Sequence, residues 1–177
     1  MKDGEGETPL YLALVSAVRY CAAGANPNIL DKHGNTAHHL LAFRLNESEV
    51  TRTLFAQLIG RGLDINVRNA RGKAPIFSLN ATRPTRLRSQ CYRKHERADD
   101  AGAFAVLEAA GADFFARDKK GRGLLHVAAE GSEVRFQMLL DKGLDPMLEY
   151  EGGQTALDFA AACGNKDLLG IFERKEE

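Results

Sequence analysis

The side chains of this sequence that could carry chemistry are its histidines, one cysteine–histidine pair and one pair of carboxylates. Cys91 and His95 have the spacing of half a zinc site, but a structural zinc ion needs four ligands and no second pair has suitable spacing. Asp99 and Asp100 directly precede a predicted helix, so we interpret them as charges that favour a helix N-terminus rather than as an acid–base pair. Because phosphate-loop and nucleophile motifs are also missing, the sequence predicts no catalytic residue, metal site or cofactor.

The composition is that of a soluble globular protein without a strong charge preference. Of the 177 residues, 44% are apolar and 27% are charged, and 24 Lys and Arg balance 24 Asp and Glu. A domain that seeks nucleic acid is normally basic overall, so this balance argues against that class. The three cysteines form no disulfide framework, and no apolar run is long enough to cross a membrane. We therefore expect an intracellular protein, cytoplasmic or nuclear.

Glycines at regular spacing divide the chain into units. Five glycines each stand just before a predicted helix start, and a second set of four stands ten residues ahead of the last four. Two turn signals held at one separation indicate a repeat protein, in which neighbouring units bury a continuous core. The helix-start glycines are Gly6, Gly34, Gly72, Gly121 and Gly153, and the second set is Gly24, Gly62, Gly111 and Gly143.

Each unit is predicted to contain a short first helix, a longer second helix and an extended segment. The second helices have one apolar face, and the glycine after each is suited to a C-cap of positive φ. Thr8, Thr36 and Thr155 are expected to cap first helices, whereas Ala74 and Gly123 lack the hydroxyl, at a cost of roughly 1 kcal/mol each. The predicted first helices are 10–14, 38–43, 76–80, 125–129 and 157–162, and the second helices are 50–59, 103–110, 134–140 and 168–172.

This pattern resembles the ankyrin-repeat family over essentially the whole chain. The motif Gly6-x-Thr8-Pro9-Leu10, the turns that begin at Asp31 and Asp118, and the segment Leu125-His126-Val127-Ala128-Ala129 carry the resemblance. It implies an all-α solenoid of about five helix–turn–helix units with extended, β-hairpin-like finger loops, forming a single domain over residues 1–177. The expected repeats are 4–30, 31–68, 69–117, 118–149 and 150–177, with an insertion at 81–98 within the third.

The resemblance also implies roles for three histidines. His39 and His126 occupy the place where ankyrin repeats often carry a histidine that hydrogen-bonds to a neighbouring turn. We therefore expect a structural role for both, rather than catalysis or metal binding. His38 stands where the family usually has leucine, which predicts a weaker contact between units at that point.

In ankyrin arrays the finger tips and the exposed side of the first helices form the usual recognition surface. Mapped by motif, the middle of this surface is strongly basic, although the net charge of the chain is zero. We expect it to bind a protein partner with acidic side chains, because complementary charge raises the association rate and sets the register. The alternative is a solvated basic surface without a partner. The mapped residues are Lys32, His33, Phe43, Arg44, Arg68, Arg71, Lys73, Arg117, Lys119, Lys120 and Arg122.

The insertion is the second candidate surface. Residues 82–97 are rich in basic side chains, including Arg86, Arg88, Arg93 and Lys94. Such a segment could contact RNA, an acidic protein or another domain of the same chain, but its single tyrosine offers little surface for base stacking. The alternative is an exposed basic excursion without a partner. Nucleic acid is therefore not the expected partner.

Together, these observations predict a monomeric, non-enzymatic module that binds a protein. One alternative is a regulatory or targeting segment of a larger enzyme or multidomain protein, since the chain begins close to a helix-capping threonine without a preceding finger. Another is nucleic-acid association through residues 82–97, which a steep loss of binding with rising salt would support.

Overall fold

The described part of the chain is helical. The computed structural model describes residues 30–45, 49–60, 62, 64–80, 90–130, 132–165 and 168–169, and none of these residues lies in a β-strand. The expected all-α class is confirmed for these ranges, whereas the first unit, with Thr8, lies outside them. The helices are α2 (Ala37–Ala42), α3 (Glu49–Ile59), α4 (Pro75–Asn80), α5 (Gln90–Ala109), α6 (Leu124–Ala129), α7 (Glu133–Asp141) and α8 (Ala156–Ala162).

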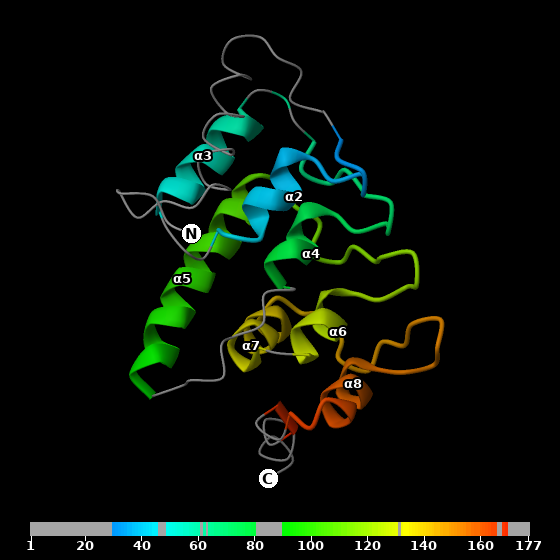
Figure 1. Cartoon of the computed structure of the whole chain (residues 1–177). Coiled ribbons are helices and arrows are strands. Elements are labelled where there is room, and N and C mark those ends of the chain that lie inside the picture. The colour runs from blue at the N-terminus through cyan, green and yellow to red at the C-terminus, as the bar shows by residue number, and fades with distance from the viewer. Residues whose placement is uncertain are drawn as a thin grey trace.

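The helices form two rows (Figure 1). The short helices α2, α4, α6 and α8 stack one on the next, and the longer helices α3, α5 and α7 contact one another in the second row. Helix α2 also packs on α3, and α6 packs on α7. Six of the seven helices begin and end within one residue of the predicted bounds, because the glycine and capping signals lie next to their ends.

Small side chains in the short helices allow close packing against large ones in the long helices. Removal of this apolar surface from water is the main stabilising contribution to the stack. The fully buried alanines of the short helices are Ala42, Ala128, Ala129, Ala156 and Ala160, and the phenylalanines at most 2% exposed are Phe55, Phe104 and Phe136 of the long helices together with Phe77 of the short helix α4. All belong to one cluster of buried apolar residues.

Helix α5 differs from the prediction. The expected helix at 103–110 is the last part of a helix of 20 residues that begins at Gln90, so part of the insertion extends this helix at its N-terminal end. The interpretation of Asp99 and Asp100 as N-terminal capping charges is therefore wrong, since both lie well inside α5. Asp100 is fully buried and pairs with Arg135 of α7.

Four turns of one design project beside the short helices (Figure 1). In each five-residue turn, the first N–H donates to the fifth carbonyl, and a glycine N–H donates to the first carbonyl, with N–O distances of 2.8–3.3 Å. Neighbouring turns are joined by single backbone hydrogen bonds of 3.0–3.2 Å, from Ala70 to His33, Lys119 to Arg71 and Glu151 to Lys120. We call these turns, at 31–35, 69–73, 118–122 and 150–154, the turn row.

Gly72 lies at the tip of the second turn and tolerates no side chain. Its φ is +74°, a conformation that costs other residues roughly 1–2 kcal/mol. A Cβ atom at Gly72 would also lie 2.8 Å from the backbone nitrogen of Lys119, which bonds to Arg71. We expect Gly72→Ala to lower the free energy of unfolding by the strain of the left-handed backbone plus the loss of contact between two turns.

The control for this prediction is Gly62→Ala. Gly62 has a φ of +80°, but its added Cβ would meet nothing within 4 Å. Chemical denaturation of both variants should show the larger loss for Gly72→Ala. Equal losses would mean that contact between the turns adds no measurable stability.

Candidate protein-binding surface

His39 connects the start of α2 to the turn row. Its Nδ1 accepts the backbone N–H of Thr36 at 3.1 Å, and its Nε2 lies 2.9 Å from the carbonyl oxygen of Lys73. These partners select the neutral tautomer that carries its proton on Nε2. Burial lowers the pKa of His39, which favours the same neutral form. The predicted bond from His39 to a neighbouring turn is thus confirmed.

His126 repeats this arrangement at the start of α6. Its Nδ1 accepts the backbone N–H of Gly123 at 3.2 Å, and its Nε2 lies 3.4 Å from the carbonyl oxygen of Gln154. Burial lowers the pKa of His126 as well. The prediction of a weakened helix start at Gly123 considered only the missing hydroxyl, and it missed the hydrogen bond that the imidazole ring accepts from the Gly123 N–H.

A groove lies between the first two turns of the row and helix α4. It encloses about 390 Å³ and is lined by the side chains of His33, Asn35, Asn69, Arg71, Lys73, Phe77 and Ser78, with Ala70. The two asparagines are already engaged with each other, since Nδ2 of Asn69 donates to Oδ1 of Asn35 at 2.8 Å. The lining of the groove therefore contains mainly hydrogen-bond donors and cationic side chains, and no carboxylate.

Lys73 is the central cation of this groove. Its side chain is half-buried, and its Nζ lies 5.9 Å from the centroid of the Phe77 ring. Burial lowers the pKa of the Lys73 ammonium, and the nearby Arg122 guanidinium lowers it further. A partially desolvated ammonium gains from any anion placed beside it, because the attraction is less screened than at an exposed site. The groove can accordingly bind a carboxylate.

The remaining basic side chains in the turn row, and those of Arg68 and Arg117 directly before two of its turns, differ in their availability. Arg122 is neutralised by Asp118, whose Oδ2 accepts Nη2 at 2.8 Å and Nε at 3.0 Å. Arg68 donates to the carbonyl oxygens of Arg117 and, at 3.3 Å, of Gly72, which leaves its charge exposed. The side chains of Arg71, Arg117, Lys119 and Lys120 are also exposed.

The other predicted contact residues do not all join this surface. Lys32 and His33 are exposed in the first turn, Phe43 is 45% exposed after α2, and Arg44 is half-buried. Arg86 and Arg88 lie outside the described residues. Arg93 and Lys94 belong to α5, and their side chains are likewise outside the description. Sequence mapping also missed Phe77 and Ser78 in the groove, although their place on the first helix of a unit could have indicated them.

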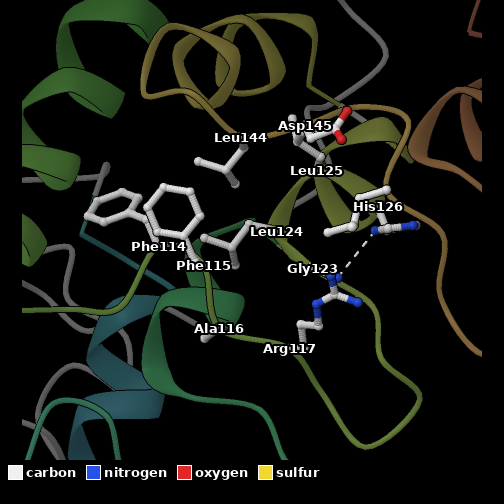
Figure 2. Close-up of a pocket in the computed structure, with 11 residues that line it drawn as sticks. Phe114, Phe115, Ala116, Arg117, Gly123, Leu124, Leu125, His126, Leu144 and Asp145 are labelled. Carbon is white, nitrogen blue, oxygen red and sulfur yellow. Dashed lines mark hydrogen bonds between the residues drawn. The ribbon is translucent and has the colours of Figure 1, made fainter.

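A second, smaller pocket is apolar (Figure 2). It encloses about 110 Å³ between the segment 114–117, the start of α6 and the segment 144–148. Phe114, Leu124 and Leu144 supply buried parts of its wall, while Phe115 is 68% exposed. Arg117 and Asp145 are its charged lining residues. None of these residues except Arg117 was predicted to take part in binding.

The described residues show neither a metal-binding cluster nor a membrane-spanning helix. They include no group of three or more His, Cys, Asp and Glu side chains arranged to hold a metal ion. No helix among them has both the length and the apolar character needed to cross a bilayer.

The stacked helix pairs and the turn row define a helical repeat protein with an extended surface for a partner. Over nearly its whole length, the chain is similar to the NF-kappa-B inhibitor cactus of Drosophila melanogaster, with 30% identity over 179 residues. It is 28% identical over 181 residues to the nuclear factor NF-kappa-B p105 subunit of Gallus gallus, and 29% identical over 175 residues to the B-cell lymphoma 3 protein homolog of Mus musculus. No protein-family model matches the chain.

These similarities imply ankyrin repeats and support a protein-binding role. The matches cover 99%, 98% and 95% of this chain, but only 32%, 17% and 35% of the cactus, p105 and B-cell lymphoma 3 relatives. The chain thus spans about a third or less of the length of the relatives that it matches.

Proposed function

We propose that this chain is a monomeric, non-enzymatic ankyrin-repeat module that binds an acidic segment of a protein partner along its turn row, inside the cell. In this proposal residues 1–177 form one domain of about five units with finger loops, interrupted by the insertion at 81–98. The observation that carries the proposal is the groove beside Lys73, where a half-buried ammonium and the exposed Arg71 face an opening without an acidic lining residue.

Two properties of the surface favour a peptide-like partner. Neighbouring turns are joined by backbone hydrogen bonds, and the histidines that support them are bonded at both ring nitrogens. A surface held in this way loses little conformational freedom on binding, which lowers the entropic cost of association. Because two cactus relatives are named inhibitors of NF-kappa-B, a subunit of that factor is the first protein to test as a partner.

We expect Arg71→Glu/Lys119→Glu/Lys120→Glu to weaken partner binding at least about tenfold, chiefly through slower association. The three side chains are exposed, so the variant should fold normally. Biolayer interferometry with a purified NF-kappa-B subunit and, separately, with a synthetic glutamate-rich peptide would measure both rate constants. Wild-type association should slow as salt rises.

The control variant places acidic charge on the long helices instead. Ala56, Gln57 and Ala105 are exposed residues of α3 and α5, so Ala56→Glu/Gln57→Glu/Ala105→Glu makes the chain more acidic at a distance from the turn row. This variant should bind nearly as the wild type does. If the turn-row variant keeps wild-type affinity for every partner that the chain binds, the turn row is not the recognition surface.

A second candidate function is that the module regulates a larger protein of which it is a segment. The support for it is that each relative is at least about three times longer than the region it shares with this chain. Sequencing the complete transcript tests this candidate, because an additional catalytic domain would support it and an open reading frame of these residues alone would exclude it.

A further inference from the structure

The same small turn follows three successive second helices. In each, an aspartate Oδ1 accepts the backbone N–H of the residue two positions later, at 2.8, 2.9 and 2.8 Å. Equal geometry makes the three acceptor–donor pairs equivalent positions of neighbouring units. The pairs are Asp64 with Asn66, Asp113 with Phe115, and Asp145 with Met147.

At the first of these positions, the side chain links two units. Nδ2 of Asn66 donates to the carbonyl oxygen of Gly111 at 3.0 Å, and Oδ1 of Asn66 accepts the backbone N–H of Asp113 at 2.9 Å. A single amide thus joins two consecutive units. Neither Phe115 nor Met147 can make such a link, because their side chains lack the amide donor and acceptor.

Phe115 and Met147, which stand at the positions equivalent to Asn66, are exposed and do not pack in the core. Phe115 is 68% exposed and Met147 is 61% exposed, and Leu148 beside them is 37% exposed. Unlike Asn66, the side chains of Phe115 and Met147 make no polar link between units, and they leave apolar surface in water. An exposed apolar cluster that does not stabilise its own fold is typical of an interaction site.

Of these exposed side chains, Phe115 and Leu148 line the apolar pocket that Figure 2 shows, and Met147 is next to Leu148 in the chain. The lining of the pocket includes Phe114, Phe115, Leu124, Leu144 and Leu148. Below Phe114, the wall is held firmly, since this ring packs edge-to-face on Phe104 at 5.7 Å and the ammonium of Lys142 lies 4.6 Å from its centroid. The pocket therefore offers a preformed apolar recess with exposed apolar side chains beside it.

The charges around the pocket indicate what accompanies the apolar group. Arg117 is the cation of the lining, and its guanidinium contacts the carbonyl oxygen of Glu149 at 3.5 Å, with no ion pair to any described residue. Asp145, the anion of the lining, already uses Oδ1 in its own turn. A carboxylate on the ligand would meet the unpaired charge of Arg117.

We propose that this pocket, with Phe115 in its lining and the exposed Met147 next to its lining residue Leu148 in the chain, is a second binding surface that takes a partner segment bearing an apolar side chain beside a carboxylate. Burial of the apolar side chain against Phe115, Leu144 and Leu148 and contact with the exposed Met147 supply affinity, and the carboxylate bound to Arg117 sets the orientation of the segment. The surface acts independently of the turn-row residues Arg71, Lys119 and Lys120, which are absent from its lining.

The test uses Phe115→Asn/Met147→Asn, which places at both positions the residue that links units at Asn66. The wild-type chain would select binders from a phage-displayed library of random twelve-residue peptides. We expect the selected peptides to pair Asp or Glu with Leu, Ile, Phe or Met. Binding to the double variant should be at least about tenfold weaker, while its unfolding midpoint should equal or exceed that of the wild type.

Three further variants show which side chains are responsible for peptide binding. Val50→Asn removes an apolar side chain that is 51% exposed on α3, and it should leave peptide affinity unchanged. Arg117→Gln should weaken acidic peptides several-fold but not their Asn or Gln analogues. The turn-row variant Arg71→Glu/Lys119→Glu/Lys120→Glu should keep its affinity for the selected peptides at about 0.3 M salt, where distant charges are screened, so that failure of the turn-row proposal is recognised separately.

Three results would overturn the proposal of a second surface. The library could enrich no peptide on the wild type relative to Phe115→Asn/Met147→Asn, or the selected peptides could lack acidic residues. The wild type and the double variant could also bind the selected peptides with equal affinity. Self-association of the wild type that the double variant abolishes, measured by light scattering, would instead assign the patch to contact between copies of the chain.

Discussion

Replacing Asp100 with alanine is expected to lower the free energy of unfolding by about 3–5 kcal/mol. Oδ2 of Asp100 lies 2.9 Å from Nε of Arg135, and the two residues are 0% and 2% exposed. Removal of the carboxylate breaks an ion pair that lies inside the protein. Removing one partner of a buried ion pair is among the most destabilising changes a point substitution can make.

The pair has this effect because it joins three helices. Asp100 lies on α5 and Arg135 on α7, and Nη1 of Arg135 donates to the carbonyl oxygen of Leu79 in α4 at 2.7 Å. This carbonyl is close to the end of α4, where backbone acceptors no longer have partners within the helix. One guanidinium thus satisfies a helix end and holds the extended helix α5 against the rest of the stack.

Urea denaturation of matched variants measures this contribution. Glu49→Ala is the control, because Glu49 pairs with Arg52 at 2.8 Å but its side chain is 79% exposed, and such pairs contribute at most about 1 kcal/mol. Asp100→Leu/Arg135→Met should lose less stability than Asp100→Ala, since it leaves neither charge unpaired. A loss for Asp100→Ala no larger than that for Glu49→Ala would contradict the prediction.

The buried pair also illustrates which parts of the fold the sequence could predict. Helix ends were predicted within a residue where a glycine, proline or threonine lies at the end, because these signals act on the local backbone. Asp100 and Arg135 are 35 positions apart, and no local pattern connects them. The sequence pattern predicts a helix that starts after Asp100 and so assigns Asp100 to its N-terminus, whereas α5 begins at Gln90.

At the candidate site, too, the sequence predicts features that depend on a local motif but not contacts that depend on the folded structure. The motif placed the basic residues in the turn row, and it indicated that His39 and His126 bond to neighbouring turns. It could not show that Arg122 is neutralised by Asp118 or that Lys73 is half-buried over Phe77. The sequence did not indicate the apolar pocket, because no sequence motif marks Phe115 as a surface residue, and only the structure shows that it is 68% exposed and lines the pocket.

His38 is expected to make the protein less stable in mild acid. Its side chain is fully buried, its ring packs edge-to-face on Phe55 at 4.8 Å, and neither ring nitrogen has a hydrogen-bond partner among the described residues. Burial lowers the pKa of His38 from 6.5 to about 4, and the neighbouring His39 lowers it while Asp64 raises it. The folded protein therefore holds His38 neutral over a range where the unfolded chain would protonate it.

The sign of the effect follows from proton binding. Between pH 6.5 and about 4, the unfolded state binds a proton at His38 that the folded state does not, so stability falls as the pH is lowered. A shift of this size corresponds to about 3 kcal/mol, which is fully present above pH 6.5 and is lost on the way to pH 4. Other titrating groups change stability in this range as well, so the effect must be isolated by comparison with a variant.

His38→Leu provides that comparison. Leucine removes the two unsatisfied nitrogens and keeps an apolar side chain against Phe55, so the variant should be about 1–2 kcal/mol more stable than the wild type at neutral pH. The difference between the two proteins, from urea denaturation at intervals from pH 7 to pH 4, should widen as the pH falls. Parallel pH profiles would contradict the prediction, as would a His38 imidazole that titrates near pH 6.5 when followed by NMR in the folded protein. A widening difference would show that the contact of His38 in α2 with Phe55 in α3 weakens in acid. A unit with leucine at this position would not have this pH dependence.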